Sequence, residues 1–152
     1  MGTKREKDSL AFLLNSGARL LNSAFERRIA EAGLGLTPGE ARALLTVAVV
    51  DGSKQSDIAA RLGIEPMTIC AYLDKLQSLD LIERRQDPQD RRSKRIVMTK
   101  NAAEMLEAVR QEIDELVRHA TQGLNDEEVA LFRSFLQTLR NNLQPEQSSQ
   151  GC

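Results

Sequence analysis

The chain has 152 residues, a formal net charge of −1 and 3% aromatic residues. This length suits one domain with an ordinary hydrophobic core and leaves no room for an additional enzyme domain. No apolar run approaches the roughly 18 residues of a membrane-spanning helix, and the N-terminus is charged, so we expect a cytoplasmic protein without membrane contact. Two distant cysteines exclude a secreted disulfide framework, and the shortage of aromatic residues excludes a stacking platform for single-stranded nucleic acid.

The first two expected helices precede the central part of the chain. Apolar residues recur at helical spacing over residues 8–32, which predicts a long helix that ends at Gly33. A second helix is expected over residues 38–50. Its start is indicated by Thr37 and Glu40, which have the spacing of a capping box, with a proline at the first helical position.

Two further helices follow at the spacing of a helix-turn-helix. The first ends at Gly63, and Ser53 is placed to cap its start. The second starts around Glu65, with Pro66 in its first turn. One side of this second helix must face a core, because its apolar residues fall at i, i+4 and i+7, namely Ile69, Leu73 and Leu76. The opposite side is free to enter a groove.

Two strand-like runs and a turn come next and predict a β-hairpin, the wing. The runs are LIERR and KRIVMT, and the connecting QDPQDRRS contains proline and aspartate residues that favour a turn. Residues 84–100 contain seven basic and two acidic residues, a net charge of +5, so the remainder of the chain carries −6. A charge run alone is usually a solvated surface. Directly after a helix-turn-helix, it indicates binding to a polyanion such as duplex DNA.

Two long amphipathic helices complete the chain. Either Thr99 or Asn101 can cap the first of them, and Asn125 and Glu128 form a second capping box at the start of the last one. The fold class is therefore mainly α with a small β-hairpin wing (α+β), a winged helix-turn-helix with additional N- and C-terminal helices.

The three helices outside the winged unit have apolar faces that this unit cannot cover. Exposed apolar stripes of that length favour association, and two-fold dimers are the commonest oligomers. We expect a homodimer, the alternative being a monomer that folds these helices onto itself. The expected domains are an N-terminal dimerisation helix (1–36), a winged lobe (37–100), C-terminal dimerisation helices (101–144) and a disordered tail (145–152). The expected interface residues are Leu10, Leu13, Leu14, Ile113, Leu116, Leu136 and Leu139.

Three strings carry a resemblance to a known family: GLTPGEARALL before the motif, LDKLQSLDLIERR at the end of the recognition helix and DPQDRRSKRIVMT in the wing. Over nearly its whole length the chain resembles the MarR (multiple-antibiotic-resistance regulator) family of transcription factors. The resemblance implies a dimeric regulator that binds a pseudopalindromic operator in duplex DNA. It further implies a repressor that is released by a small aromatic or phenolic effector.

By position, the resemblance places the start of the recognition helix in the major groove. Ala71 stands where many relatives have arginine, so base readout is expected to use thymine methyl contacts, the Thr68 hydroxyl or DNA shape. In the wing, Arg92 matches the family's minor-groove arginine, and Asp90 matches the acid that stabilises the loop, by pairing with Arg84. The predicted DNA-binding residues are Ser53, Lys54, Gln55, Ser56, Met67, Thr68, Ala71, Lys75, Arg91, Arg92 and Lys94.

The resemblance also implies an effector pocket between the dimer helices and the DNA-binding lobe. Arg19 and Arg42 are its candidate carboxylate partners, with surface arginines as the alternative interpretation. His119 is the only histidine, and nothing in the sequence places ligands or catalytic partners beside it. We therefore expect no metal, no cofactor and no enzymatic activity.

Two alternative functions remain open. Cys70 lies on the DNA-facing helix and could make the protein a thiol-switched regulator, although a buried cysteine commonly behaves as a small apolar residue. Cys152, at the last position, is not expected to be functional. The second alternative is a winged-helix module that binds proteins and not DNA, which would leave the basic wing unexplained.

Overall fold

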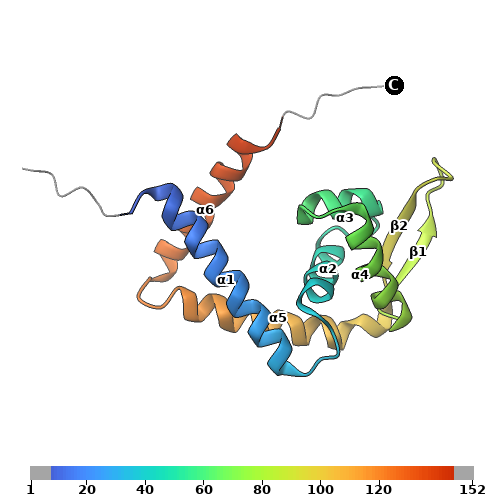
Figure 1. Ribbon diagram of the computed structural model, residues 1–152, viewed down its shortest axis with the longest axis horizontal. Coiled ribbons are helices and arrows are strands. Elements are labelled where there is room, and N and C mark those ends of the chain that lie inside the picture. The colour runs from blue at the N-terminus through green and yellow to red at the C-terminus, as the bar shows by residue number, and fades with distance from the viewer. Residues whose placement is uncertain (1–7, 146–152) are drawn as a thin grey trace, which may run out of the picture. The chain divides into compact units, whose positions relative to one another are not determined.

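The structure is a computed structural model that describes residues 8–145. In this part of the chain it contains six α-helices, a short 3-10 helix and one antiparallel hairpin (Figure 1), so the predicted fold class is confirmed. The elements are α1 (Leu10–Ala32), α2 (Pro38–Val49), α3 (Gln55–Leu62), α4 (Pro66–Ser78), β1 (Ile82–Gln86), β2 (Lys94–Met98), η1 (Lys100–Ala102), α5 (Ala103–Ala120) and α6 (Asp126–Leu143).

Local capping patterns set the start of several helices. At α2 the Thr37 hydroxyl accepts a hydrogen bond from the Glu40 amide at 3.2 Å, and the Glu40 carboxylate accepts one from the Thr37 amide at 2.8 Å. Asn125 and Glu128 form the same reciprocal pair at α6. Both predicted capping boxes are therefore confirmed. The first helix begins slightly later than predicted, because the Ser9 hydroxyl accepts from the Phe12 amide and caps it.

The predicted cap of α3 is wrong. Lys54, not Ser53, is the N-cap residue, and among the described residues it makes no side-chain capping bond. Ser53 lies outside the helix because its carbonyl accepts a hydrogen bond from the Ile96 amide of β2 at 2.9 Å. The competition between helix capping and strand pairing is decided by residues far away in the sequence.

Thr99, one of the two predicted caps after the wing, is the N-cap residue of the 3-10 helix that leads into α5, but among the described residues its side chain makes no capping bond. The chain enters α5 through the 3-10 helix η1, and both proposed capping side chains turn back toward Asp80. The Thr99 hydroxyl donates to the Asp80 carbonyl at 2.6 Å, and the Asn101 amide donates to the Asp80 carboxylate. Asp80 has a positive φ of 58° in the turn between α4 and β1. These bonds hold that turn in place.

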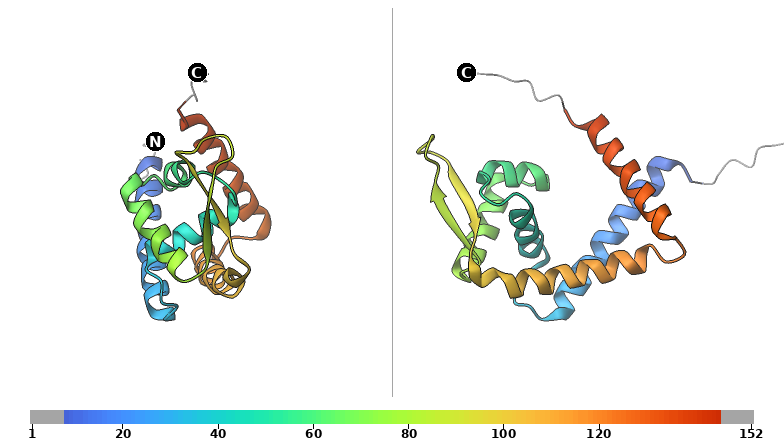
Figure 2. Two further views of the ribbon diagram at one scale, coloured as in Figure 1. Left: turned by 90° about the vertical axis from the view of Figure 1, so that its right-hand side faces the viewer. Right: turned by 180° about the vertical axis from the view of Figure 1, so that it is seen from behind.

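The described residues divide into two compact units between Leu116 and Val117, inside α5. The first unit holds the hydrophobic core. In it, α2 packs against α1, α3 and α4, while β1 contacts α4 and β2 contacts both α2 and α3 (Figure 2). Side chains that are fully buried come from each of these layers, including Leu44, Ile58, Leu73 and Ile96. This core fixes the orientation of α4 and of the hairpin.

The hairpin pairs Ile82 with Met98 at its base and Gln86 with Lys94 near its tip. An isolated antiparallel bridge between Lys54 and Arg95 adds a third extended segment beside β2. The turn between α2 and α3 is thereby joined to the wing, a pairing that the sequence pattern did not reveal.

Candidate nucleic-acid interface

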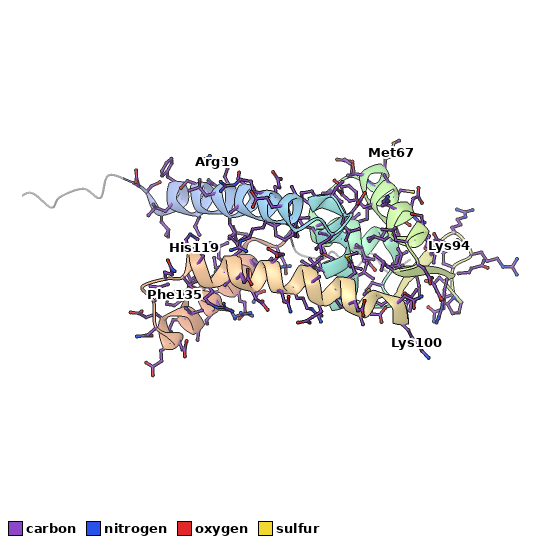
Figure 3. The ribbon with its side chains drawn as sticks, turned by 90° about the horizontal axis from the view of Figure 1, so that it is seen from below. Arg19, Met67, Lys94, Lys100, His119 and Phe135 are labelled. Carbon is purple, nitrogen blue, oxygen red and sulfur yellow. The ribbon has the colours of Figure 1, made fainter. Side chains whose placement is uncertain are left out.

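The recognition helix α4 has one buried side and one exposed side. Its buried residues are Ile69, Leu73 and Leu76, as predicted from their spacing. Met67 is 87% exposed near the start of the helix, and Figure 3 shows it pointing away from the other helices. Ala71 and Lys75 are exposed as well, and Thr68 is half-buried. Of the predicted DNA-binding residues of α4, Met67, Ala71 and Lys75 therefore lie on the side opposite the core, and Thr68 lies at its edge.

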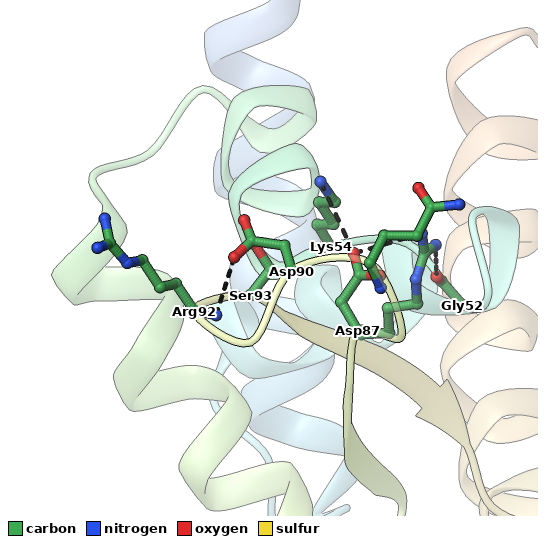
Figure 4. A network of polar contacts seen from close by, with 8 residues as sticks. Gly52, Lys54, Asp87, Asp90, Arg92 and Ser93 are labelled. Carbon is green, nitrogen blue, oxygen red and sulfur yellow. Dashed lines mark hydrogen bonds and ion pairs between the residues drawn. The ribbon is translucent and has the colours of Figure 1, made fainter.

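The tip of the wing is ordered by Asp90. Its carboxylate accepts hydrogen bonds from the Arg92 amide at 2.9 Å and from the Ser93 hydroxyl at 3.1 Å, and its carbonyl accepts one from the Ser93 amide (Figure 4). The predicted cations Arg91, Arg92 and Lys94 are exposed around this turn. Asp90 thus shapes the loop that carries Arg92 through local bonds within the turn.

Among the described residues, Arg84 does not pair with Asp90 as predicted. Arg84 lies opposite Ile96 in the middle of the hairpin, too far along the strand to reach the tip, and its guanidinium is directed at α4. It forms an ion pair with Asp74 at 2.8 Å. Its hydrogen bonds go to the side chains of Gln77 and Gln55 and to the carbonyl of Cys70. Arg84 therefore links β1 to the recognition helix and to α3.

Asp87 is the acidic residue that the sequence reasoning missed. It is 2% exposed, at the end of β1. One carboxylate oxygen accepts a hydrogen bond from the Gln89 amide at 2.9 Å, and the other faces Arg95 Nη2 at 3.4 Å and Lys54 Nζ at 3.7 Å. The Gln89 amide and, after it, the charges of Arg95 and Lys54 hold the pKa of Asp87 below its usual value, against the opposing effect of burial. One feature of the sequence could have indicated this role for Asp87: it is an acidic residue at the end of a predicted strand, within a strongly basic segment.

The turn between α2 and α3 completes this network. The Gly52 amide donates to the Ile96 carbonyl at 2.8 Å. The Arg95 guanidinium donates to the Gly52 carbonyl at 2.9 Å (Figure 4). Of the predicted phosphate contacts at this turn, Ser56 is exposed, whereas Ser53, Lys54 and Gln55 are half-buried. The start of α3 and the wing are therefore held together on the same unit.

A pocket of about 230 Å³ lies within the first unit. It is lined by Asn22, Gly39, Arg42, Leu62, Ile64 and Tyr72. Arg42 stacks over the Phe25 ring at 4.9 Å from its centroid and lies 3.8 Å from the Glu26 carboxylate. The other predicted pocket residue, Arg19, is exposed on α1.

The remaining candidate chemistry is sparse. Cys70 is half-buried on α4, and Cys152 lies outside the described residues. His119 is exposed on α5. Within residues 8–145, no three His, Cys, Asp or Glu side chains lie close enough together to hold a metal ion. In the same range, no helix is both long and apolar enough to cross a lipid bilayer.

Residues 34–93, which contain the helix-turn-helix and the wing up to Ser93, match the sequence profile of the MarR family. They form a MarR-family domain. The resemblance inferred from the sequence is thereby confirmed. The chain is also similar to the uncharacterized HTH-type transcriptional regulator YdgJ of Bacillus subtilis (strain 168), with 25% identity over 113 aligned residues. The aligned region covers 74% of this chain and 69% of that protein.

Solved structures of MarR-family proteins have the same fold. A MarR-family transcriptional regulator from Silicibacter pomeroyi is 23% identical, with a TM-score of 0.79 over 90% of this chain and 91% of that one. A MarR-family regulator from Rhodococcus sp. RHA1 is 24% identical, with a TM-score of 0.77 over 90% and 96% of the two chains. The family consists of transcriptional regulators, which are not enzymes, and regulation of transcription through DNA binding is the function that this assignment supports.

Proposed function

We propose that the protein is a homodimeric repressor that binds a pseudopalindromic DNA operator and is released by a small aromatic or phenolic molecule. Residues 37–100 supply the DNA-binding lobe, and residues 1–36 and 101–144 supply the dimerisation helices. A cytoplasmic location belongs to the same proposal, because the protein must reach duplex DNA.

The observation that carries the proposal is the combination of the exposed side of α4 with the basic tip of the wing. Met67 and Thr68 lie in the first turn of α4. In a recognition helix, the N-terminal turn is the part that meets base edges in the major groove. The wing adds Arg91, Arg92 and Lys94, whose charges suit phosphates and a narrow minor groove. Arg84 and Asp87 hold these two elements in a fixed relation to the core.

Dimerisation is supported by apolar side chains that lack cover. Among the described residues, α6 buries none of its side chains, and Phe135 is 65% exposed. Leu136 and Leu139 are half-buried. On α1 the predicted interface residues Leu10 and Leu13 are exposed. Leu14 and Ile113 are half-buried, while Leu116 is buried. Exposed apolar side chains of this kind, on each of the two units taken separately, mark a protein-protein interface, and a second copy of the chain would cover them.

An effector is supported by the pocket that residues of α1, α2, α3, α4 and the turn after α3 line. Arg42 offers a guanidinium that a carboxylate could approach in place of Glu26, which lies at the long distance of 3.8 Å. Leu62, Ile64 and Tyr72 offer apolar and aromatic surface to a flat ring. This composition suits a small aromatic acid.

The decisive experiment is selection of bound sites from random duplexes, followed by sequencing. We expect a pseudopalindrome whose half-site centres lie about 10 bp apart, one turn of the double helix. A salt titration with random duplex should show a steep loss of affinity, because phosphate contacts release counterions. A chain that binds no duplex at low salt would favour the protein-interaction alternative.

The effector is tested with benzoate as the simplest aromatic carboxylate. Benzoate should release the chain from the selected operator, and Arg42→Gln should raise the concentration required. Arg19→Gln is the matched control, because Arg19 is an exposed arginine on α1. Equal effects of the two substitutions would contradict the assignment of Arg42.

A further inference from the structure

Gly39 is a glycine whose missing side chain provides space for another residue. It is the second residue of α2, which begins at Pro38. A Cβ atom at this position would overlap Cζ and Oη of Tyr72 and lie 2.9 Å from its Cε1. Non-bonded carbon atoms prefer separations of about 3.5–4.0 Å. The phenol ring of Tyr72 therefore lies directly against the backbone of α2.

Backbone conformation does not account for this glycine. Gly33 and Gly63 have positive φ angles of 64° and 67°, which only glycine adopts readily. Gly39, by contrast, occupies an ordinary helical position, where alanine would favour the helix more than glycine does. At the other such position, Gly17, an added Cβ would meet no described atom within 4 Å. Packing of Tyr72 is thus the physical reason for glycine at position 39.

Tyr72 connects the pocket to the recognition helix. Within α4 it lies between Ala71, on the exposed side, and Leu73, which is fully buried. The other lining residues come from α1, α2, α3 and the turn after α3, whereas Tyr72 is the lining residue that α4 supplies. A molecule that enters the pocket and displaces this ring acts on the helix that carries Thr68 and Ala71.

We propose that Tyr72, packed on Gly39, is the positioning residue through which the pocket sets the orientation of α4. This inference rests on the proposed DNA-binding function. With the ring on Gly39, α4 holds its exposed side in the arrangement that fits the operator. Any group that occupies the space over Gly39 moves the ring and shifts α4, because a densely packed interior relieves overlap by moving side chains and backbone. A methyl group at position 39 should therefore have the same effect as an effector.

The test is Gly39→Ala with a double-mutant cycle. We expect Gly39→Ala to weaken binding to the selected operator by about tenfold, the scale of an overpacked interior site. Binding to random duplex and its salt dependence should not change, because the wing cations stay in place. Tyr72→Ala should abolish the effect of Gly39→Ala, since the overlapping ring is gone. Tyr72→Phe is the matched control, because it keeps the overlapping Cζ and should leave the effect intact.

A second measurement is independent of DNA. Tyr72 is the only tyrosine, and the chain contains no tryptophan, so the intrinsic tyrosine fluorescence comes from this ring alone. Its quenching by acrylamide should increase in Gly39→Ala. Unchanged quenching would overturn the inference. The inference would also be overturned if Gly39→Ala lowered the operator affinity by the same factor in the parent and in Tyr72→Ala. A parent chain that binds no duplex would contradict the proposed function instead, and the fluorescence would still decide whether Gly39 positions Tyr72.

Discussion

At the scale of single residues, the cations near the wing differ in their partners. Lys54 and Arg95 both face the buried carboxylate of Asp87, whereas Arg92 is exposed at the tip. A cation that already has a carboxylate partner gains less from a phosphate than a fully solvated cation does. Arg92 should therefore account for more of the salt dependence of DNA binding than Lys54 or Arg95.

Arg92→Ala should weaken binding to the operator and to random duplex alike. It should also reduce the magnitude of the salt slope by about one unit per subunit, because one phosphate contact releases about one counterion. Thr68→Val is the contrasting change. It should weaken operator binding by about 1 kcal/mol through the loss of a hydrogen bond and leave the slope unaltered. Both are measured by titrating duplex at several salt concentrations, and an intact slope in Arg92→Ala would remove the wing from the interface.

Asp87→Asn should destabilise the folded chain in a pH-dependent way. The pKa of Asp87 is lowered in the folded chain, chiefly by the Gln89 amide. Its carboxylate therefore favours folding at every pH above the usual carboxyl pKa of about 3.9, and this contribution is lost as the pH falls through the lower folded value. The stability difference between parent and Asp87→Asn should be present at pH 7 and shrink below about pH 4. Denaturant unfolding at both pH values measures it.

The control for that comparison is Asp114→Asn, at an exposed position of α5. It should change the free energy of unfolding little at either pH. A loss of stability in Asp87→Asn that is the same at pH 7 and pH 3 would show that the amide disturbs packing and that the charge is unimportant.

At the scale of elements, the features that depend on residues within one helical turn of each other were predictable from the sequence. The boxes at Thr37 and Asn125 were found because their partners lie three residues away. The bridge between Lys54 and Arg95 joins segments distant in the sequence, and it both displaced the expected cap of α3 and created the site for Asp87. The exposed side of α4 was predictable from periodicity, whereas the partners of Arg84 were not, because they depend on how the hairpin packs on α4.

Thr37→Ala should lower the free energy of unfolding by about 1 kcal/mol, the usual value of an N-terminal cap. The effect should reach the whole first unit, because α2 contributes several fully buried side chains to its core. Thr37→Ser keeps the hydroxyl and should retain most of the stability. Denaturant unfolding distinguishes the two, and equal losses would mean that the hydroxyl does not cap the helix.

At the scale of the whole molecule, the apolar faces of the terminal helices decide between monomer and dimer. Phe135→Asp should abolish the dimer, because a carboxylate in a dry helix-helix interface costs several kcal/mol. Specific DNA binding should be lost with it, since one half-site binds too weakly alone. In a monomer the same substitution would be harmless, because Phe135 is 65% exposed.

Sedimentation of the parent and of Phe135→Asp over a range of concentrations measures this effect. Leu136→Asp, at a neighbouring half-buried position, should behave in the same way. A parent that sediments as a monomer while it binds the full operator would contradict the dimer.

The separation of charge along the chain has a kinetic consequence. The segment from Arg84 to Lys100 carries +5, and the rest of the chain carries −6. At distances beyond a Debye length, which is about 10 Å at 0.1 M salt, DNA experiences mainly the small net charge of the chain, so the electrostatic attraction is weak. At closer range the negative part of the protein is repelled while the hairpin is attracted, so the molecule is rotated into a productive orientation before contact. We therefore expect the association rate to depend on salt mainly through orientation, with short residence on DNA that lacks the operator.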